Sequence, residues 1–293
     1  MPPRSQSKSV GVALGLTAYL LALVAGVAAG RAMVSLHPLL ALLVGDLAAM
    51  SVVFLASLLA DNSSLYDPYW SLQPLGVAGC WLWLRWPELG ARQYIVAALV
   101  LLYSVRLTLN FYRGWRGLGA EDFRYADLRR RYGRFYWPLS FLGIHLMPTL
   151  VVYAGCLPLY AALVAAGGRP GWLDGAAAAF TLGAIGLAFA ADEQLRRFRR
   201  DPATVGRCMR TGLWRASRHP NYLGEIAGWW GLFLFGLTAG GAWWWTLVGP
   251  LAITLLFVTV SIPLMERRMR ATRQGYEEYR RCTPTLLPKR LGR

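Results

Sequence analysis

Polar and cationic side chains gather at the start of a hydrophobic segment near residue 220. The chain there reads Thr211-Gly-Leu-Trp-Arg-Ala-Ser-Arg-His-Pro-Asn-Tyr-Leu-Gly-Glu225. The free backbone amides at the start of a helix carry partial positive charge, and adjacent guanidinium groups add to it. We therefore expect this stretch to hold an anionic group at the membrane surface, which a simple anchor would not need.

A second set of charged residues ends the preceding hydrophobic segment. Asp192, Arg196 and Arg199 occur at i, i+4 and i+7, so a helix would place them on one face. Further arginines follow at 207, 210, 215 and 218. Several bidentate guanidinium groups suit a polyanion such as the pyrophosphate and 2′-phosphate of a dinucleotide. The alternative is a helix end whose arginines extend into solvent.

A third set lies inside a hydrophobic segment. Tyr103, Arg106 and Asn110 occur at i, i+3 and i+7, so one helical face carries all three. A charged residue within a membrane span has to face protein or water, which makes it a candidate functional residue. The alternative for Arg106 is that its side chain only reaches the membrane surface. Just after the segment, Arg113 and Arg116 are expected to add phosphate contacts.

An acid and several aromatic residues form a fourth set, in a loop on the same side. This loop reads Tyr66-Asp-Pro-Tyr-Trp-Ser-Leu-Gln-Pro74. An acid hydrogen-bonded to a tyrosine can help it donate a proton to a substrate carbonyl, and Asp67 is the candidate acid. The alternative is that Asp67, which precedes a proline, is only a turn residue.

The Arg-His-Pro-Asn-Tyr-Leu-Gly run at residues 218–224 resembles a signature of two families of membrane enzymes. It is similar to the C-terminal domain of the membrane steroid 5-alpha-reductase family, especially its DUF1295 branch, which residues 113–125 also resemble. More distantly, it resembles the isoprenylcysteine carboxyl methyltransferases, which share Arg-His-Pro-x-Tyr-x-Gly. The resemblance covers residues 65–290.

The resemblance implies NADPH as cofactor. In the reductases the matching positions contact NADPH, and here they are Asp192, Arg199, Arg207 and Asn221. In the reductases, the tyrosine that matches Tyr103 pairs with an acid from an early span. In this chain Gln73-Pro74 stands where a Gln-Glu pair is expected, so Asp67 is taken as that acid.

The full set of residues predicted to bind the cofactor is Arg106, Asn110, Arg113, Arg116, Asp192, Arg199, Arg207, His219, Asn221 and Tyr222. His219 precedes a proline, and helix initiation explains that dipeptide nearly as well. The residues assigned to the substrate are Trp70, Gln73 and Glu225.

Composition indicates an all-α polytopic membrane helix bundle. The 293 residues are 56% hydrophobic, too apolar for an ordinary soluble protein. We expect about 7–8 transmembrane helices in one domain, 1–293, with N-terminal spans in 1–112, a reductase-like region in 113–293 and the cofactor site at the cytoplasmic end. The predicted spans are 10–30, 38–60, 69–84, 93–112, 139–165, 172–195, 223–239 and 243–264. The third is short and contains Pro74, so a half-buried segment is the alternative.

Positive charge is distributed unevenly between the two sides of this bundle. Of the 31 Lys and Arg residues, 26 lie at the N-terminus, in the loops 113–138 and 196–222, and in the tail 265–293. Since cytoplasmic loops carry the excess of Lys and Arg, we expect both termini in the cytoplasm, and the composition suggests a bacterial inner membrane. The charges flank spans, which argues against nucleic acid as a partner. The four cysteines show no metal or disulfide spacing.

Three function classes fit these patterns. The leading expectation is an NADPH-dependent reductase of a conjugated C=C bond in a lipophilic enone, with membrane lipid as surroundings, Tyr103 and Asp67 as catalytic residues and no metal. No Gly-x-Gly-x-x-Gly run follows a strand pattern, so helix ends and arginines would hold the cofactor in place of a Rossmann domain. The alternatives are an S-adenosylmethionine-dependent methyltransferase and a non-catalytic lipid-binding protein.

Overall fold

The computed structural model describes residues 8–165 and 169–287, which form helices and loops without a β-strand. Arg4 and residues 288–293 were counted in the positive charge predicted on the cytoplasmic side, and they lie outside the described residues. The N-terminal half contains α1 (Lys8–Ala32), α2 (Pro38–Leu59), η1 (Ser63–Tyr66), α3 (Tyr69–Arg85) and α4 (Ala91–Gly114). A short connecting region follows, with α5 (Phe123–Tyr132) and η2 (Gly133–Phe135). The predicted all-α bundle is thus confirmed.

The C-terminal part of the bundle consists of three longer helical passes and a tail. The first is a bent run of α6 (Tyr136–Ser140), η3 (Phe141–Leu146), α7 (Met147–Tyr160) and η4 (Ala161–Ala165). The second is α8 (Trp172–Arg200), followed by η5 (Pro202–Thr204), α9 (Leu213–Ala216) and α10 (Pro220–Thr238). The last comprises η6 (Trp243–Leu247), α11 (Val248–Leu256), η7 (Phe257–Ser261) and α12 (Ile262–Thr272), before α13 (Tyr276–Cys282).

Each of the eight predicted hydrophobic segments lies in one of these helices or helical runs. In the described chain, six of them are long and apolar enough to cross a membrane. The two others are α3, which has only 17 residues, and α10. The start of α10 carries Asn221 and Glu225, yet 11 of its 19 residues are buried. A helix enclosed by other helices exposes little surface to lipid, so α10 tolerates these polar residues.

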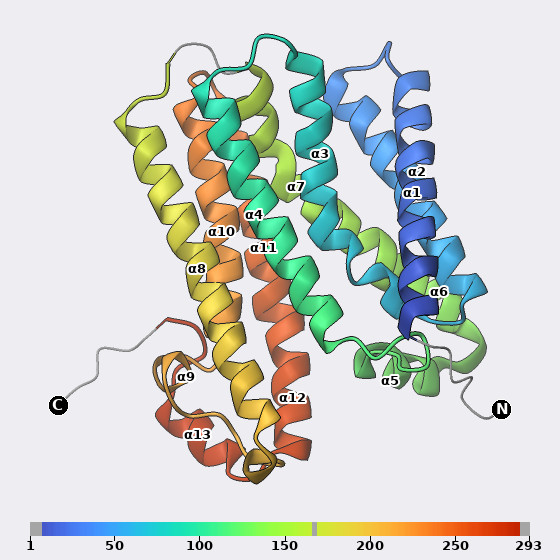
Figure 1. The fold of residues 1–293 in the computed structure, drawn as a ribbon, viewed down its shortest axis with the longest axis vertical. Helices are drawn as coiled ribbons and strands as arrows, with labels where there is room; N and C mark the ends of the chain where they lie inside the picture. Colours follow the sequence, from blue (N-terminus) through green and yellow to red (C-terminus); the bar gives the residue numbers. More distant parts are fainter. Residues whose placement is uncertain (1–7, 166–168, 288–293) are drawn as a thin grey trace.

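Helices α8 and α10 pack closely along much of their length, and Figure 1 shows them side by side. Small residues permit this approach. A Cβ atom placed on Gly224 of α10 would lie 2.6 Å from the backbone nitrogen of Ala188 on α8. Helices in membranes associate through such small residues, because lipid provides little hydrophobic drive for their contact. The close contact brings polar side chains at the lower ends of α8 and α10 within hydrogen-bonding distance.

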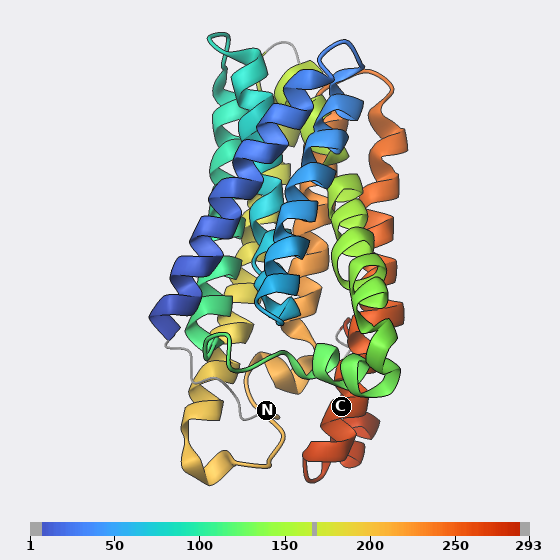
Figure 2. The ribbon, with the colours of Figure 1, turned by 90° about the vertical axis from the view of Figure 1, so that its right-hand side faces the viewer.

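The long loops and the tail gather at one end of the bundle. Figures 1 and 2 show α5, α9 and α13 at the end where α1 begins and where α4, α8 and α12 finish. At the opposite end, Arg92 of α4 forms a buried ion pair with Asp174 of α8, at 2.7 Å. The Thr238 hydroxyl at the end of α10 also donates to Asp174, at 2.7 Å. Helices α4, α8 and α10 are therefore joined by polar contacts away from the end that carries the loops.

The first prediction concerns topology. In a chain whose native cysteines are replaced by serine, single cysteines at the exposed positions Gly119 and Ala203 should react only with a reagent supplied from the cytoplasmic side. The positive charge of their loops retains them there. A cysteine in place of Glu88, between α3 and α4, should react only from the other side, as the control. Labelling of Gly119 and Glu88 variants from the same side would contradict the arrangement.

Candidate functional site

The site begins with Asp192 on α8, which accepts hydrogen bonds from two other helices. From α4, Arg106 donates at 3.2 Å and the Asn110 amide at 3.1 Å. From α10, the Asn221 amide donates at 3.0 Å. The spacing that placed Arg106 and Asn110 on one face of α4 therefore does bring them to a common partner. This carboxylate joins three helices at the loop-bearing end.

Arg106 also binds a second carboxylate, that of Glu225 on α10. Arg106 and Glu225 are 8% and 5% exposed, so this ion pair is almost dry. One guanidinium group thus pairs with two acids and balances only one negative charge, so in this buried setting the second carboxylate needs further donors. Asn110 and Asn221 supply them to Asp192, and Arg196 of α8 in turn donates to the Asn110 carbonyl oxygen at 3.2 Å.

Several buried polar atoms in this network have no hydrogen-bond partner among the described residues. They are the Arg106 Nε, the Asn221 Oδ1 and the Glu225 Oε2 atoms. Buried polar atoms in native proteins nearly always have a partner from protein, water or ligand. Two acceptors and one donor in one network therefore indicate a place where a polar ligand or water completes the bonding.

Tyr103 lies one turn from Arg106, and its hydroxyl is buried without a partner in the described chain. Its ring packs edge-on against Trp229, with centroids 5.7 Å apart, and the Arg106 guanidinium lies 5.7 Å from the ring centre. Glu225 is its electrostatic neighbour. The void beside Tyr103 has a volume of only about 10 Å³, about the size of a single water molecule.

A larger cavity of about 230 Å³ opens on the loop side of the network. Seven of the ten residues predicted to bind the cofactor line it: Asn110, Asp192, Arg199, Arg207, His219, Asn221 and Tyr222. They come from α4, α8, α10 and the loop between α8 and α10. The predicted set is thus largely one contiguous surface, although its members are up to 112 positions apart in the sequence.

Three cavity-lining arginines have no carboxylate partner in the described residues: Arg199, Arg207 and Arg273. Arg218 differs, because its guanidinium group pairs with Glu266 at 2.7 Å and donates to Thr285 Oγ1 at 2.8 Å. The Arg218 guanidinium group therefore links Glu266 of α12 to Thr285 of the tail. The three others leave an excess of positive charge at the cavity, which favours an anionic ligand.

The C-terminal tail closes one side of the cavity. The backbone amides of Arg218 and His219 donate to the carbonyls of Pro284 and Thr285, at 2.9 and 3.2 Å. This fixes α13, from which Tyr276 and Tyr279 line the cavity. Burial raises the pKa of Tyr276 to about 12, with the Glu266 carboxylate adding to the effect. Its hydroxyl is thus protonated at neutral pH, and it has no partner among the described residues.

Asp67 lies elsewhere. It accepts a hydrogen bond from the hydroxyl of Tyr125 on α5, and Arg124 lies 3.7 Å away. Burial raises the pKa of Asp67 to about 7, an effect that the Arg124 guanidinium opposes. The structure thus pairs Asp67 with Tyr125, and the acid beside Tyr103 is Glu225. The resemblance implied that this acid comes from an early span, whereas the carboxylate near Tyr103 in the structure comes from α10.

Four other predicted residues also lie away from the cavity lining. Arg113 and Arg116, at the end of α4, are exposed. Gln73 donates to Asp46 of α2 at 2.6 Å and to the Thr149 carbonyl at 3.0 Å, and Trp70 is half-buried between the two hydrophobic clusters of the bundle. Phosphate contacts from Arg113 or Arg116 would require a ligand that extends beyond the cavity.

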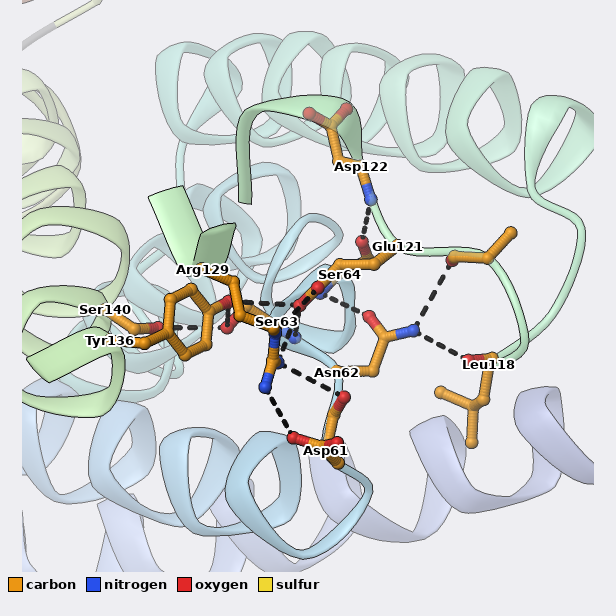
Figure 3. A network of polar contacts seen from close by, with 11 residues as sticks. Asp61, Asn62, Ser63, Ser64, Leu118, Glu121, Asp122, Arg129, Tyr136 and Ser140 are labelled. Carbon is orange, nitrogen blue, oxygen red and sulfur yellow. Dashed lines mark hydrogen bonds and ion pairs between the residues drawn. The ribbon is translucent and has the colours of Figure 1, made fainter. Parts of the chain in front are cut away.

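A polar network anchors the loop that follows α4, as Figure 3 shows. The Asn62 amide donates to the Leu118 carbonyl at 2.8 Å, and the Ser63 backbone amide donates to Glu121 at 2.9 Å. Arg129 then bridges Glu121, at 3.2 Å, and Asp61, at 2.7 Å. One arginine of this loop, Arg129, therefore serves to attach it to the α2–α3 connection.

Sequence reasoning missed several residues of the cavity. They come mainly from α12 and the tail: Cys208, Met209, Met265, Met269, Arg273, Tyr276 and Tyr279. The tail reads as an ordinary charged surface helix, and its only signal is the spacing of Tyr276 and Tyr279 at i and i+3. Asp46, a lone acid inside a predicted span, was also overlooked, although its position alone marks it as unusual.

The comparisons with known proteins place this arrangement in a family. A family described as "Protein of unknown function (DUF1295)" matches residues 53–284. The chain belongs to the DUF1295 family. It is also similar to an uncharacterized protein of Schizosaccharomyces pombe, with 31% identity over 231 residues, which covers 71% of this chain and 67% of that protein. No solved structure matches the chain significantly.

The family match begins in α2 and ends in the tail, so it includes every residue that lines the cavity. It therefore supports the part of the resemblance that concerns DUF1295. In the described residues, no group of three or more His, Cys, Asp or Glu side chains could hold a metal ion. The carboxylates of the network pair with Arg106 and with neighbouring side-chain amides.

The second prediction concerns the stability of the network. Arg106→Ala leaves Glu225 and Asp192 buried without their shared cation, which should lower the free energy of unfolding by about 3–5 kcal/mol. Arg197→Ala is the matched control, because this exposed arginine pairs with Glu193 outside the network and such pairs contribute only about 0–1 kcal/mol. Unfolding of both variants in detergent measures the difference. Equal losses would show that Arg106 does not carry the network.

Proposed function

We propose that this DUF1295 protein is a membrane reductase that uses NADPH to reduce a conjugated C=C bond in a lipophilic enone. The observation that supports this proposal most is the spatial order of three groups of side chains along the site. Unpaired arginines line the outer cavity, a network with unpartnered buried atoms follows, and Tyr103 lies beyond it. The arginines would contact the phosphates of NADPH, the network its nicotinamide amide, and the Tyr103 hydroxyl the carbonyl of the enone. Hydride transfer from NADPH to an enone requires these contacts in this order.

The residues present fit the phosphate-bearing part of NADPH. Arg199, Arg207 and Arg273 provide donors for pyrophosphate and 2′-phosphate oxygens, for which planar guanidinium groups are well suited. Asn221 Oδ1, which lacks a partner, provides an acceptor for an amide group. A volume of about 230 Å³ is below the ~300–1,000 Å³ of typical ligand pockets, so the whole dinucleotide needs more space than the cavity now gives.

The cofactor would supply the hydride, and the chain would polarise the substrate. The Tyr103 hydroxyl would donate a hydrogen bond to the enone carbonyl oxygen and stabilise the negative charge that develops there. Arg106 would keep Glu225 in an ion pair, which leaves the single phenolic proton of Tyr103 for the carbonyl oxygen. The void at Tyr103 is too small for a carbonyl compound, so substrate binding would also require movement of α4, α8 or α10 relative to one another.

A methyltransferase that uses S-adenosylmethionine is the second candidate. The aromatic lining from Tyr222, Tyr276 and Tyr279 favours it, since aromatic faces attract a sulfonium cation. Against it is the positive charge of the same cavity, because S-adenosylmethionine has no phosphate that would pair with three free arginines. The two candidates therefore predict opposite responses to the loss of these arginines.

The third prediction concerns the arginines of the cavity. A charge-assisted hydrogen bond to phosphate contributes about 1.5–3 kcal/mol. Arg199→Ala and Arg207→Ala should each weaken NADPH binding about 10- to 100-fold. Arg200→Ala is the control, since this neighbouring arginine is exposed and does not line the cavity. Direct binding measurements in detergent test the three variants, and equal affinities would exclude the cavity as the phosphate site.

The fourth prediction concerns Tyr103. Because its hydroxyl has no partner in the described chain, Tyr103→Phe should leave the unfolding temperature almost unchanged. Turnover of a model enone should fall about 100-fold or more, as expected for loss of a principal oxyanion donor. Tyr136→Phe, a buried tyrosine of the loop-anchoring network, should keep its turnover per folded enzyme. Near-normal turnover by Tyr103→Phe would exclude Tyr103 as the donor.

A further inference from the structure

A second buried acid, Asp46, lies outside the cofactor cavity. It belongs to α2, one of the helices apolar enough to cross a membrane, and is 8% exposed. The hydroxyl of Tyr69 donates to its Oδ1 atom at 2.7 Å, and the amide of Gln73 donates to its Oδ2 atom at 2.6 Å. Both donors come from α3, so the carboxyl group is held between α2 and α3 with each oxygen engaged.

No cation faces this carboxyl group in the described part of the chain. The titratable side chains around it come from η1, α3 and α7 and are all acids that are neutral at pH 7: Tyr66, Tyr69, Cys80, Tyr153 and Cys156. The ion pairs of the described residues include none with Asp46. A negative charge here would therefore be balanced only by two neutral hydrogen bonds.

The other buried acids of the bundle differ in this respect. Asp174, 2% exposed, pairs with Arg92 at 2.7 Å, and Glu225 pairs with Arg106. Moving an isolated carboxylate out of water is so unfavourable that such a group takes up a proton instead. Among the described residues, a cation lies opposite Asp174 and Glu225 and none lies opposite Asp46.

The Gln73 amide is fixed by two acceptors. Its nitrogen donates to Asp46 Oδ2 at 2.6 Å and to the Thr149 carbonyl at 3.0 Å, so the nitrogen, and not the oxygen, faces Asp46. A proton on Asp46 removes the negative charge that no cation in the described residues balances. Protonation thus resolves the missing counter-charge at this dry position.

We infer that Asp46 is a proton-binding site in the membrane interior, neutral at pH 7 because it is buried between α2 and α3 without a cation opposite it. The site is separate from the cavity of unpaired arginines. Reduction of a C=C bond consumes one proton for each hydride, and Asp46 is an acid that can carry such a proton on the α2–α3 side. Only this last point rests on the proposed function.

Infrared spectroscopy of the complete protein in detergent tests the inference without any cofactor. Asp46→Asn keeps the size of the side chain and a neutral amide at the position. The difference spectrum of wild type minus Asp46→Asn at pH 7 should contain the carbonyl band of a protonated carboxylic acid, shifted in D₂O. Asp174→Asn is the matched control, and its difference spectrum should show loss of carboxylate bands only.

Loss of carboxylate bands in the Asp46→Asn spectrum would overturn the inference, because Asp46 would then be charged. A carboxylate signal that appears only with added sodium would also overturn it, because Asp46 would then bind a metal cation instead of a proton.

A second experiment is chemical modification with dicyclohexylcarbodiimide, which reacts with protonated carboxyl groups. The carboxyl oxygen attacks the central carbon of the reagent while the acid proton passes to a nitrogen, and the adduct should form on Asp46 and not on Asp174. Since neither measurement involves NADPH or an enone, a failed reductase assay leaves both results intact.

Discussion

The site depends on one guanidinium group that two carboxylates share. Arg106 of α4 binds Asp192 of α8 and Glu225 of α10, and these bonds form where the three helices leave the apolar part of the bundle. Charges at such a depth are tolerated only when they are paired. Close packing of α8 and α10 at Gly224 brings the two acids within reach of one cation. The close packing of α8 and α10 therefore brings the ion pairs together, and the ion pairs in turn make the buried charges tolerable.

This charge network divides the site into two environments. Towards the loops, the cavity is lined by aromatic side chains and by arginines that have no carboxylate partner in the described residues. Towards the membrane interior, Tyr103 and Trp229 face a small apolar void. A polar cofactor that comes from the cytoplasm and a lipophilic substrate that comes from the bilayer would meet at the network. The tail, fastened through Arg218, Glu266 and Thr285, completes the polar environment.

The sequence predicted the helices and seven of the residues that line the cavity, because both follow from local patterns. Hydrophobic length locates the spans, and the i, i+3, i+7 spacing of Tyr103, Arg106 and Asn110 defines a face whose partner has to be polar. What local patterns do not contain is the pairing between distant segments. Asp67 was assigned to Tyr103 by analogy of sequence, whereas α5 brings Tyr125 to Asp67 and α10 brings Glu225 to Tyr103. The tail residues were missed for the same reason.

The most direct test of the account is which cofactor stabilises the folded protein. A ligand that binds only the folded state at about 100 times its Kd adds about 2.7 kcal/mol of stability. Thermal unfolding of the detergent-solubilised protein with NADPH, NADH or S-adenosylmethionine measures this effect. The account predicts a large upward shift with NADPH, a smaller one with NADH and none with S-adenosylmethionine. A shift with S-adenosylmethionine alone would contradict it and identify the cavity as a methyl-donor site.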